Sequence, residues 1–383
     1  MDVLLNEEDS LLRDALRRFF EEECPPARVR EVEDSGVALD EGLWQSLAGL
    51  GWLGLAFPAT YGGSEAPLTD LLLLFEEAGR SLAPVPLHPH IVAGMTLAKF
   101  GTPAQKERLL PGAAGGSLRL TWAHSGGGVE GGASGSGNGK TVQAKREGGG
   151  WRLHGVVCFV DGYEGARSCL VPVQGDSGAE PVSLVLVEPG SEGLSATMAR
   201  SLSGERQALL RLDGVRVTDE DVVSPPNEGA AAAREMVRLA VLLNTALIVG
   251  ATRRAVERAV DYAKERVAFG KPIGAFQAIA HLCANMIIWV DGAELLARQA
   301  AWKWAAGRDA ELEVAGAKAF ANERCQAALR EANQIHGGLA QVYEYDQQLW
   351  YRRAAAWSMR LGTSIEHRRT VARRLGLGGV CRP

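Results

Sequence analysis

The stretch Glu265–Gln277 reads ERVAFGKPIGAFQ, and it separates two long runs of helical sequence. The run through 231–269 predicts a helix of about 36 residues, and the run through 275–307 predicts a helix of about 30. Gly270 removes a side chain at the break, and Pro272 prevents the first helix from continuing. The break therefore raises the question of whether a ligand binds where the two helices meet.

The sequence after the break continues to predict helices. One helix runs through 312–337, and a last helix follows Thr363, which is a suitable N-cap residue. Long helices with apolar stripes and short connections are typical of an antiparallel bundle. We therefore predict a C-terminal four-helix bundle over residues 224–383.

The rest of the chain predicts two further domains. Residues 1–118 are mostly helical, with Asn6 and Asp40 as N-cap residues of two helices. Residues 119–223 alternate with a period near two and are rich in β-branched residues, which predicts a β-sandwich or barrel. The sequence as a whole therefore predicts an α+β multidomain protein, with a helical domain, a β-domain and a helical bundle in that order.

The β-domain contains a Gly/Ser-rich segment, HSGGGVEGGASGSGNGK, at 124–140. We interpret it as a flexible surface loop. The alternative interpretation is a phosphate cradle, but the segment lacks the Lys-Ser/Thr pair of a P-loop.

Composition and charge narrow the class of protein. The chain has 383 residues and a net charge of −5, which argues against nucleic acid as the main partner. The apolar run 239–251 is about a dozen residues long and contains Asn244, so it predicts no membrane span. The six cysteines show no metal-ligand spacing, which favours reduced thiols, no metal site and a cytoplasmic location.

Two motifs carry a resemblance to a known family. They are Arg-x-x-Phe-Gly-x-Pro-Ile-x-x-Phe-Gln at 266–277 and Gln-x-His-Gly-Gly at 334–338. With GWLGLAFPATYGGSE at 51–65 and LRLDGVRV at 210–217, they make nearly the whole chain resemble the acyl-CoA dehydrogenase family. This resemblance implies an acyl-CoA substrate, FAD bound between subunits, and an electron-transfer flavoprotein or similar acceptor. The implied reaction gives the α-proton to a carboxylate and the β-hydride to flavin N5, leaving a 2-enoyl-CoA.

The resemblance also assigns residues to FAD. Arg266 is expected on the pyrophosphate, because a guanidinium matches phosphate oxygens in pairs. Phe269 gives apolar cover, and Gln277 is expected near the adenosine end. Taken singly, an Arg at a helix end and a Gly-Gly pair after a helix are usually structural. The neighbouring subunit is expected to approach the same FAD with three residues: Gln334, Gly337 and Gly338.

The β-domain departs from the family at the flavin ring. The family places Trp-Ile-Thr there, and the matching residues here put Phe159 at the Trp position and Asp161 at the Thr position. Asp161 would add negative charge beside the flavin, but the alternative is that it begins a solvent-facing turn. The family's flavin-contacting loop is also changed, because AHSGGGVEGG at 123–132 lacks its proline and has its carboxylates missing or moved.

Both places where the family carries its catalytic glutamate hold apolar residues. These are Leu361, after the last long helix, and Ala240, on the long helix before the break. Neither side chain accepts a proton. Glu235 and Glu366 each lie more than a turn away, and we favour a solvated helix face for both. Thr363 is expected to cap the final helix and to bond the flavin.

Three functions remain open from the sequence. The first is a flavin-dependent acyl-CoA dehydrogenase with an unidentified base, acting alone or as one chain of a heteromer. The second is a non-catalytic partner that completes the FAD site of a homologue carrying the glutamate, as in bacterial heteromers whose chains resemble segments 159–173 and 343–369. The third and weakest is a flavin monooxygenase on the same fold.

Overall fold

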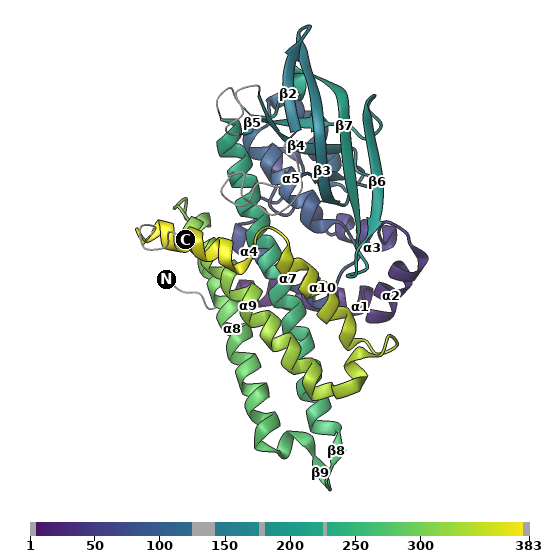
Figure 1. The fold of residues 1–383 in the computed structure, drawn as a ribbon, viewed down its shortest axis with the longest axis vertical. Helices are drawn as coiled ribbons and strands as arrows, with labels where there is room; N and C mark the ends of the chain where they lie inside the picture. Colours follow the sequence, from purple (N-terminus) through teal and green to yellow (C-terminus); the bar gives the residue numbers. More distant parts are fainter. Residues whose placement is uncertain (1–4, 125–141, 176–180, 225–227, 378–383) are drawn as a thin grey trace. The chain divides into compact units, whose positions relative to one another are not determined.

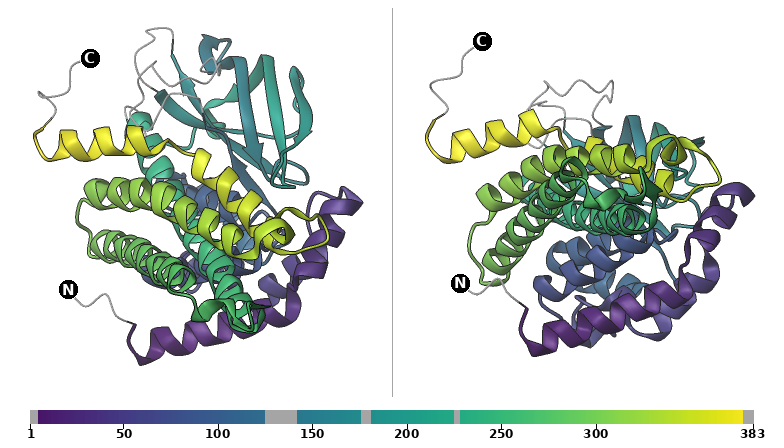
Figure 2. Two further views of the ribbon diagram at one scale, coloured as in Figure 1. Left: turned by 60° about the horizontal axis from the view of Figure 1, so that its bottom comes forward. Right: turned by 90° about the horizontal axis from the view of Figure 1, so that it is seen from below.

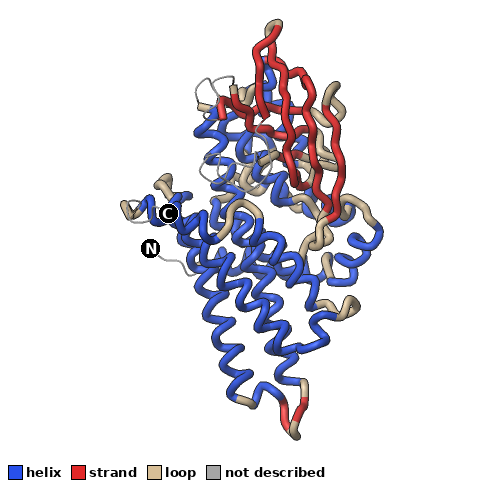
Figure 3. The backbone as a smooth tube through the Cα atoms, in the orientation of Figure 1, coloured by secondary structure: helices blue, strands red, loops and turns tan. Residues whose placement is uncertain are grey.

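The computed structural model describes residues 5–124, 142–175, 181–224 and 228–377 (Figure 1). Helices, then strands, then helices follow one another along the chain (Figure 3), which confirms the predicted fold class. The chain divides into two compact units that are each built from separate pieces of sequence. The helical unit contains Met1–Glu31, Pro67–Ala83 and Val241–Pro383, and the sheet-containing unit contains Val32–Ala66 and Pro84–Ala240. The three domain boundaries read from the sequence stay a prediction.

The helical unit is built mainly from long helices. As predicted, Asn6 caps the first of them, because its side-chain oxygen accepts from the Asp9 N–H at 2.8 Å. The unit contains α1 (Glu7–Glu23), α4 (Leu68–Ser81), α8 (Gln277–Ala305), α9 (Glu311–His336), α10 (Gln347–Met359) and α11 (Ser364–Arg374), with parts of α2 (Pro26–Ser35) and α7 (Gly229–Glu265). Short segments are β8 (Val267–Ala268), β9 (Lys271–Pro272), η4 (Ile273–Ala275) and η5 (Gly337–Gln341). Helices α8 and α9 lie side by side in both views of Figure 2.

The backbones of α4 and α7 pass very close to each other at two glycines. A Cβ atom at Gly79 would lie 2.4 Å from the carbonyl oxygen of Leu247. A Cβ atom at Gly250 would lie 1.8 Å from the carbonyl oxygen of Glu76. Only glycine tolerates these distances, so the pair fixes the position of α7 in the core of the helical unit.

Two helices, α7 and α8, are long and apolar enough to cross a membrane by length and composition alone. The apolar window of α7 is 89% buried inside the protein, which is typical of a core helix. The window of α8 is only 17% buried, and three of its large apolar side chains are exposed: Ile287, Ile288 and Leu295. Helix α8 therefore presents an apolar face that the described chain leaves uncovered.

The sheet-containing unit combines helices with one curled, mixed sheet, which refines the predicted sandwich or barrel. Asp40 caps its first full helix, as predicted, because it accepts from the Leu43 N–H at 2.9 Å. The helical segments are η1 (Trp52–Gly54), η2 (Ala59–Tyr61), α3 (Glu41–Gly49), α5 (Leu87–Phe100), α6 (Pro103–Ala114) and η3 (Asp219–Asp221). The strands are β1 (Leu120–Trp122), β2 (Val142–Glu147), β3 (Gly150–Asp161), β4 (Ser168–Gln174), β5 (Pro181–Val187), β6 (Leu194–Arg200) and β7 (Arg206–Thr218).

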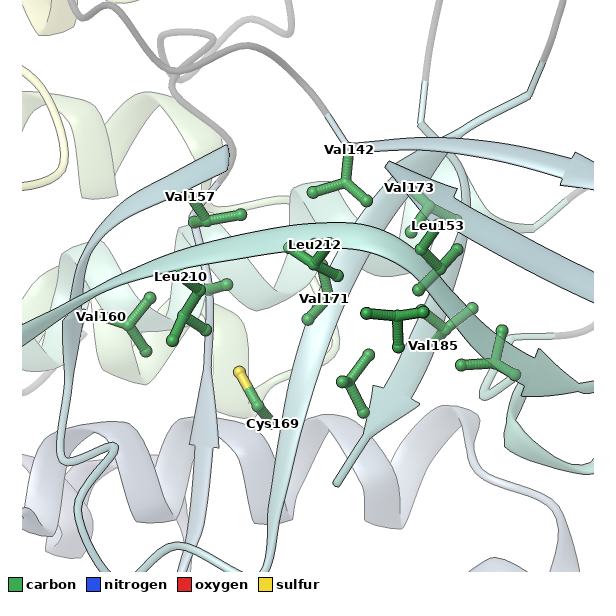
Figure 4. Close-up of a cluster of buried hydrophobic side chains, with 14 of the residues drawn as sticks. Val142, Leu153, Val157, Val160, Cys169, Val171, Val173, Val185, Leu210 and Leu212 are labelled. Atoms are coloured by element: carbon green, nitrogen blue, oxygen red, sulfur yellow. The ribbon is translucent and has the colours of Figure 1, made fainter. Parts of the chain in front are cut away.

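The strands of this sheet run in the order β1-β4-β2-β3-β7-β6, and β5 pairs with the other edge of β4. Valine and leucine side chains from β2, β3, β4, β5 and β7 form a buried core on the sheet (Figure 4). The long antiparallel pair β3–β7 has two register shifts, one of which falls between Val157 and Val160. That shift lies in the segment that the sequence places beside the flavin.

Candidate active site and FAD half-site

The break that opens at Glu265 is a tight β-hairpin. Strands β8 and β9 pair over two residues each, and the two residues between them are Phe269 and Gly270. Both have positive φ, 54° and 79°, which is the backbone of a type I′ turn. Gly270 is therefore needed for its backbone freedom, since a Cβ atom at this position would meet nothing within 4 Å. The turn leaves the Phe269 side chain 95% exposed at the tip.

Arg266 stands where α7 ends and the hairpin begins. Its N–H donates to the Tyr262 carbonyl at 2.8 Å, and its own carbonyl accepts from the Ile273 N–H at 2.8 Å. The side chain is exposed, and no ion pair joins it to another residue in the described parts of the chain. Gln277, the first residue of α8, is also exposed. A guanidinium and an amide are thus available at the two ends of the hairpin segment.

The C-terminal end of α9 carries the second predicted motif. Gln334, Gly337 and Gly338 are all exposed, and Gly337 has φ 63° and ψ −140°, a conformation that essentially only glycine adopts. The His336 ring stacks on the Tyr262 ring with centroids 4.7 Å apart and an interplanar angle of 24°. The structure therefore places the end of α9 beside the end of α7. Neither Tyr262 nor the contact of His336 with it was predicted from the sequence.

The first predicted base position, Leu361, lies in the turn between α10 and α11. Its φ is 61°, in the left-handed region that leucine rarely adopts. Two buried side chains hold the turn: His367 Nε2 donates to the Leu361 carbonyl at 2.8 Å, and Asn322 Nδ2 donates to the Gly362 carbonyl at 3.1 Å. The backbone conformation is thus fixed by hydrogen bonds that do not involve the Leu361 side chain.

A buried lysine bonds to α10, the helix that leads into this turn. Lys318 on α9 is fully buried, and its ammonium donates to the side chain of Asn244 and to the Trp357 carbonyl, the latter at 3.1 Å. Burial, with a smaller contribution from Arg360, lowers the pKa of Lys318 to about 7. No local sequence pattern predicts this contact, because Lys318 and its two partners are far apart along the chain.

The second predicted base position, Ala240, is fully buried on α7. Its carbonyl oxygen lies 2.9 Å from Nε2 of His88, on α5, so this ring nitrogen carries the proton. His88 was not among the predicted site residues. An imidazole therefore lies beside Ala240 where some family members carry a glutamate, and it is engaged with the helix backbone.

The two nearest glutamates are both held by other groups. Glu235 Oε1 accepts from the Lys99 ammonium at 2.5 Å. Glu366 accepts from the Thr363 N–H at 2.7 Å and from its hydroxyl at 2.9 Å, forming a capping box at the start of α11. The bond from the Thr363 N–H lowers the pKa of Glu366. Both carboxylates have structural partners, which is consistent with their expected non-catalytic role. The predicted Thr363 cap is confirmed.

In the sheet-containing unit, the register shift sets the positions of Phe159 and Asp161. Phe159 has φ 61° and is 74% exposed. Asp161 is the last residue of β3; its side chain accepts from Gln207 Nε2 at 2.9 Å, and its carbonyl accepts from the Thr121 hydroxyl at 2.5 Å. Asp161 is half-buried and stands directly before a turn, with its side chain hydrogen-bonded to Gln207; its place beside the flavin stays a prediction. The predicted loop at 124–140 lies, apart from His124, outside the described residues.

Backbone strain coincides with the predicted site. Among the described residues, five other than glycine have clearly positive φ, and three of these are Phe159, Phe269 and Leu361. The conformation is unfavourable for such side chains, so the surrounding structure must hold it. Such strain gathers at functional sites, so each of the three positions stays a candidate for the role that the resemblance implies.

Comparison with known proteins matches this arrangement to one family. A family model described as acyl-CoA dehydrogenase, N-terminal domain, matches residues 6–117, and one described as acyl-CoA dehydrogenase, C-terminal domain, matches residues 227–376. The acyl-CoA dehydrogenase FadE12 of Mycobacterium tuberculosis H37Rv is 34% identical over 313 residues, which cover 79% of each chain.

Solved structures give the same result over nearly the full length. A chain of the ChsE4–ChsE5 complex from Mycobacterium tuberculosis is 28% identical with a TM-score of 0.88, covering 98% of this chain and 99% of that chain. A chain of a Tcur3481–Tcur3483 steroid ACAD variant is 31% identical with a TM-score of 0.87 and the same coverage. The chain therefore belongs to the acyl-CoA dehydrogenase family of flavin-dependent oxidoreductases, which act on CH–CH groups with FAD as cofactor.

Proposed function

We propose that this chain is one subunit of a heteromeric acyl-CoA dehydrogenase that desaturates an acyl-CoA thioester to the 2-enoyl-CoA. In this proposal the chain supplies part of the FAD site, and a homologous partner chain supplies the carboxylate that takes the α-proton. FAD, when bound, accepts the β-hydride. The remaining tasks of this chain are to bind the cofactor and to complete the fold of the assembly.

The ends of α7 and α9 lie side by side in this chain, because His336 stacks on Tyr262. We therefore propose that Arg266 and the Gly337–Gly338 turn of one chain contact the same FAD, in place of the expected approach of the Gly-Gly turn from a neighbouring subunit. The Arg266 guanidinium offers paired N–H donors for phosphate oxygens, and it has no competing carboxylate in the described chain. At Gly337 and Gly338, a Cβ atom would meet nothing within 4 Å, so the backbone is open to a ligand. Gln277 adds an amide that both donates and accepts. This donor set suits a pyrophosphate with an adjoining sugar.

One observation carries the proposal: neither predicted base position holds a carboxylate, although both predicted FAD-binding motifs, at 266–277 and 334–338, are present. Leu361 and Ala240 cannot take a proton, and the nearby Glu235 and Glu366 are bound to Lys99 and Thr363. A general base typically contributes about 10²–10⁴-fold in rate. A chain without one is therefore expected to need the carboxylate of another chain.

Two further observations support a partner. The described chain leaves an apolar face of α8 uncovered, with Ile288 65% exposed and Phe269 exposed at the nearby hairpin tip. The solved relatives at 28% and 31% identity come from structures whose descriptions each name two different chains. We propose that a homologous chain covers this face. We further propose that the electrons pass to an electron-transfer flavoprotein or a similar acceptor, and that the protein is cytoplasmic.

Purification of this chain alone and together with candidate homologues tests the proposal. Alone, the chain should reduce flavin very slowly with any saturated acyl-CoA, whether straight-chain or ring-bearing. Co-expression with a homologue that carries a glutamate at the base position should yield one species that contains both chains and turns over. Brisk turnover by the chain alone would contradict the heteromer proposal and would point to a base within this chain.

A further inference from the structure

Two residues of α7 and the residue that follows the helix form a stripe that leads to the proposed FAD site. Arg258, Tyr262 and Arg266 are spaced four residues apart, so they lie on one face of the helix. Arg266 is the last of them and stands at the start of the hairpin. Contacts that hold Arg258 and Tyr262 in place therefore also set the position of Arg266.

Tyr262 is fixed by the residue that precedes the Gly-Gly turn. His336 is buried and stacks on Tyr262 with centroids 4.7 Å apart. Its Nδ1 lies 2.9 Å from the Ala332 carbonyl, so this nitrogen carries the proton of a neutral ring. Burial lowers the pKa of His336, which keeps the ring neutral near pH 7. Its buried Nε2 has no hydrogen-bond partner within the described structure.

His336 also contacts a second ring, from a segment that is anchored by other residues. The Tyr345 ring lies 5.4 Å from the His336 ring, and the Arg258 guanidinium lies over both Tyr345 and Trp350, at 5.7 and 4.9 Å. Next to Tyr345, Asp346 accepts two hydrogen bonds from Arg30 at 3.0 and 2.9 Å. The His336 ring therefore contacts two tyrosine rings, and the turn at Gly337 starts from a fixed residue.

We propose that Tyr262 and His336 are positioning residues whose stacking holds Arg266 and the Gly337–Gly338 turn in register for one phosphate-bearing ligand. The inference rests on the proposed FAD site. The hairpin pairs over only two residues on each strand, and its tip is exposed, so it offers little rigidity of its own. The stacking of Tyr262 on His336 instead joins α7, which precedes the hairpin, to α9, which precedes the Gly337–Gly338 turn.

Replacement of His336 separates stacking from hydrogen bonding. His336→Ala removes the ring, whereas His336→Phe keeps a flat ring and removes both nitrogens. If the free energy that an aromatic pair usually contributes is lost from FAD binding, His336→Ala should bind FAD about 2- to 12-fold more weakly. His336→Phe should stay within about twofold of the natural protein, because stacking alone is required. Tyr262→Leu should weaken FAD as His336→Ala does, and Tyr262→Phe should not.

The measurement is FAD titration of the protein purified as the assembly it forms in the cell and then stripped of FAD, followed by flavin fluorescence. Unfolding temperatures of the same samples separate loss of fold from loss of affinity, and the Tyr262 pair serves if His336→Ala does not fold. Equal losses for the Phe and Ala variants of His336, or no loss for His336→Ala, would overturn the inference. Arg266→Ala is the reference variant. If its FAD affinity is unchanged, the FAD site itself is refuted. If Arg266→Ala weakens FAD binding but His336→Ala does not, only the positioning role is refuted.

Discussion

Arg266→Ala is expected to weaken FAD binding strongly without disturbing the fold. The side chain is exposed at the end of α7 and forms no ion pair in the described chain, so its removal leaves no buried carboxylate unpaired. Surface changes of this kind usually alter the free energy of unfolding by less than about 0.5 kcal/mol. Hydrogen bonds to a charged group contribute about 1.5–3 kcal/mol. The dissociation constant of FAD should therefore rise about 10- to 150-fold.

Lys264→Ala provides a matched control for this prediction. It removes the same formal charge two residues away, from an exposed side chain that pairs with Asp261 at 3.1 Å. Salt screens such an exposed charge, so FAD affinity should change by less than about threefold at 0.15 M ionic strength. The contrast isolates the directed phosphate contact from the general electrostatic attraction.

The assay is the FAD content of the purified assembly, followed by titration of the stripped protein with FAD. Circular dichroism and thermal unfolding of both variants verify the fold. Retention of a full complement of FAD by Arg266→Ala would refute the assignment of this residue to the pyrophosphate. Equal losses for Arg266→Ala and Lys264→Ala would instead show that only the total charge matters.

Three further predictions concern the base positions and the buried lysine. Leu361→Glu, in protein that holds FAD, should raise the rate of flavin reduction by acyl-CoA by about 10²–10⁴-fold in stopped-flow bleaching, and no gain would show that more than the base has been lost. Glu235→Gln and Glu366→Gln should leave the slow reduction rate unchanged, and a loss beyond about tenfold would identify the altered residue as a base. The fold lowers the pKa of Lys318 from 10.5 to about 7, so the unfolded chain binds more protons than the folded chain between these pH values. The free energy of unfolding, measured by denaturant titration, should therefore rise with pH across this window, and the Lys318→Met variant should lack this rise.

The sequence predicted the elements whose causes are local. The caps at Asn6, Asp40 and Thr363 depend on residues within one turn, and each is present in the structure. The break after Glu265 was also predicted from Gly270 and Pro272. Its form as a hairpin was missed, because Phe269 must share the left-handed conformation with Gly270, and a bulky residue is unusual there.

Contacts between distant residues could not be predicted in the same way. His88 meets Ala240 across 152 positions, and Lys318 meets Asn244 across 74 positions. Nothing in the local pattern marks a lysine on α9 as buried, since lysine is normally exposed. The conformation of Phe159 likewise depends on a register shift against β7, which a period-two pattern does not encode.

The turn at Leu361 keeps its backbone conformation although its side chain cannot act as a base. Its left-handed backbone is unfavourable for leucine, and hydrogen bonds from His367 and Asn322 to the turn carbonyls offset that strain. None of these bonds involves the side chain at position 361, so the turn would hold glutamate as it holds leucine. A chain that keeps this turn but has leucine at the predicted base position fits the proposed subunit that relies on a partner's base.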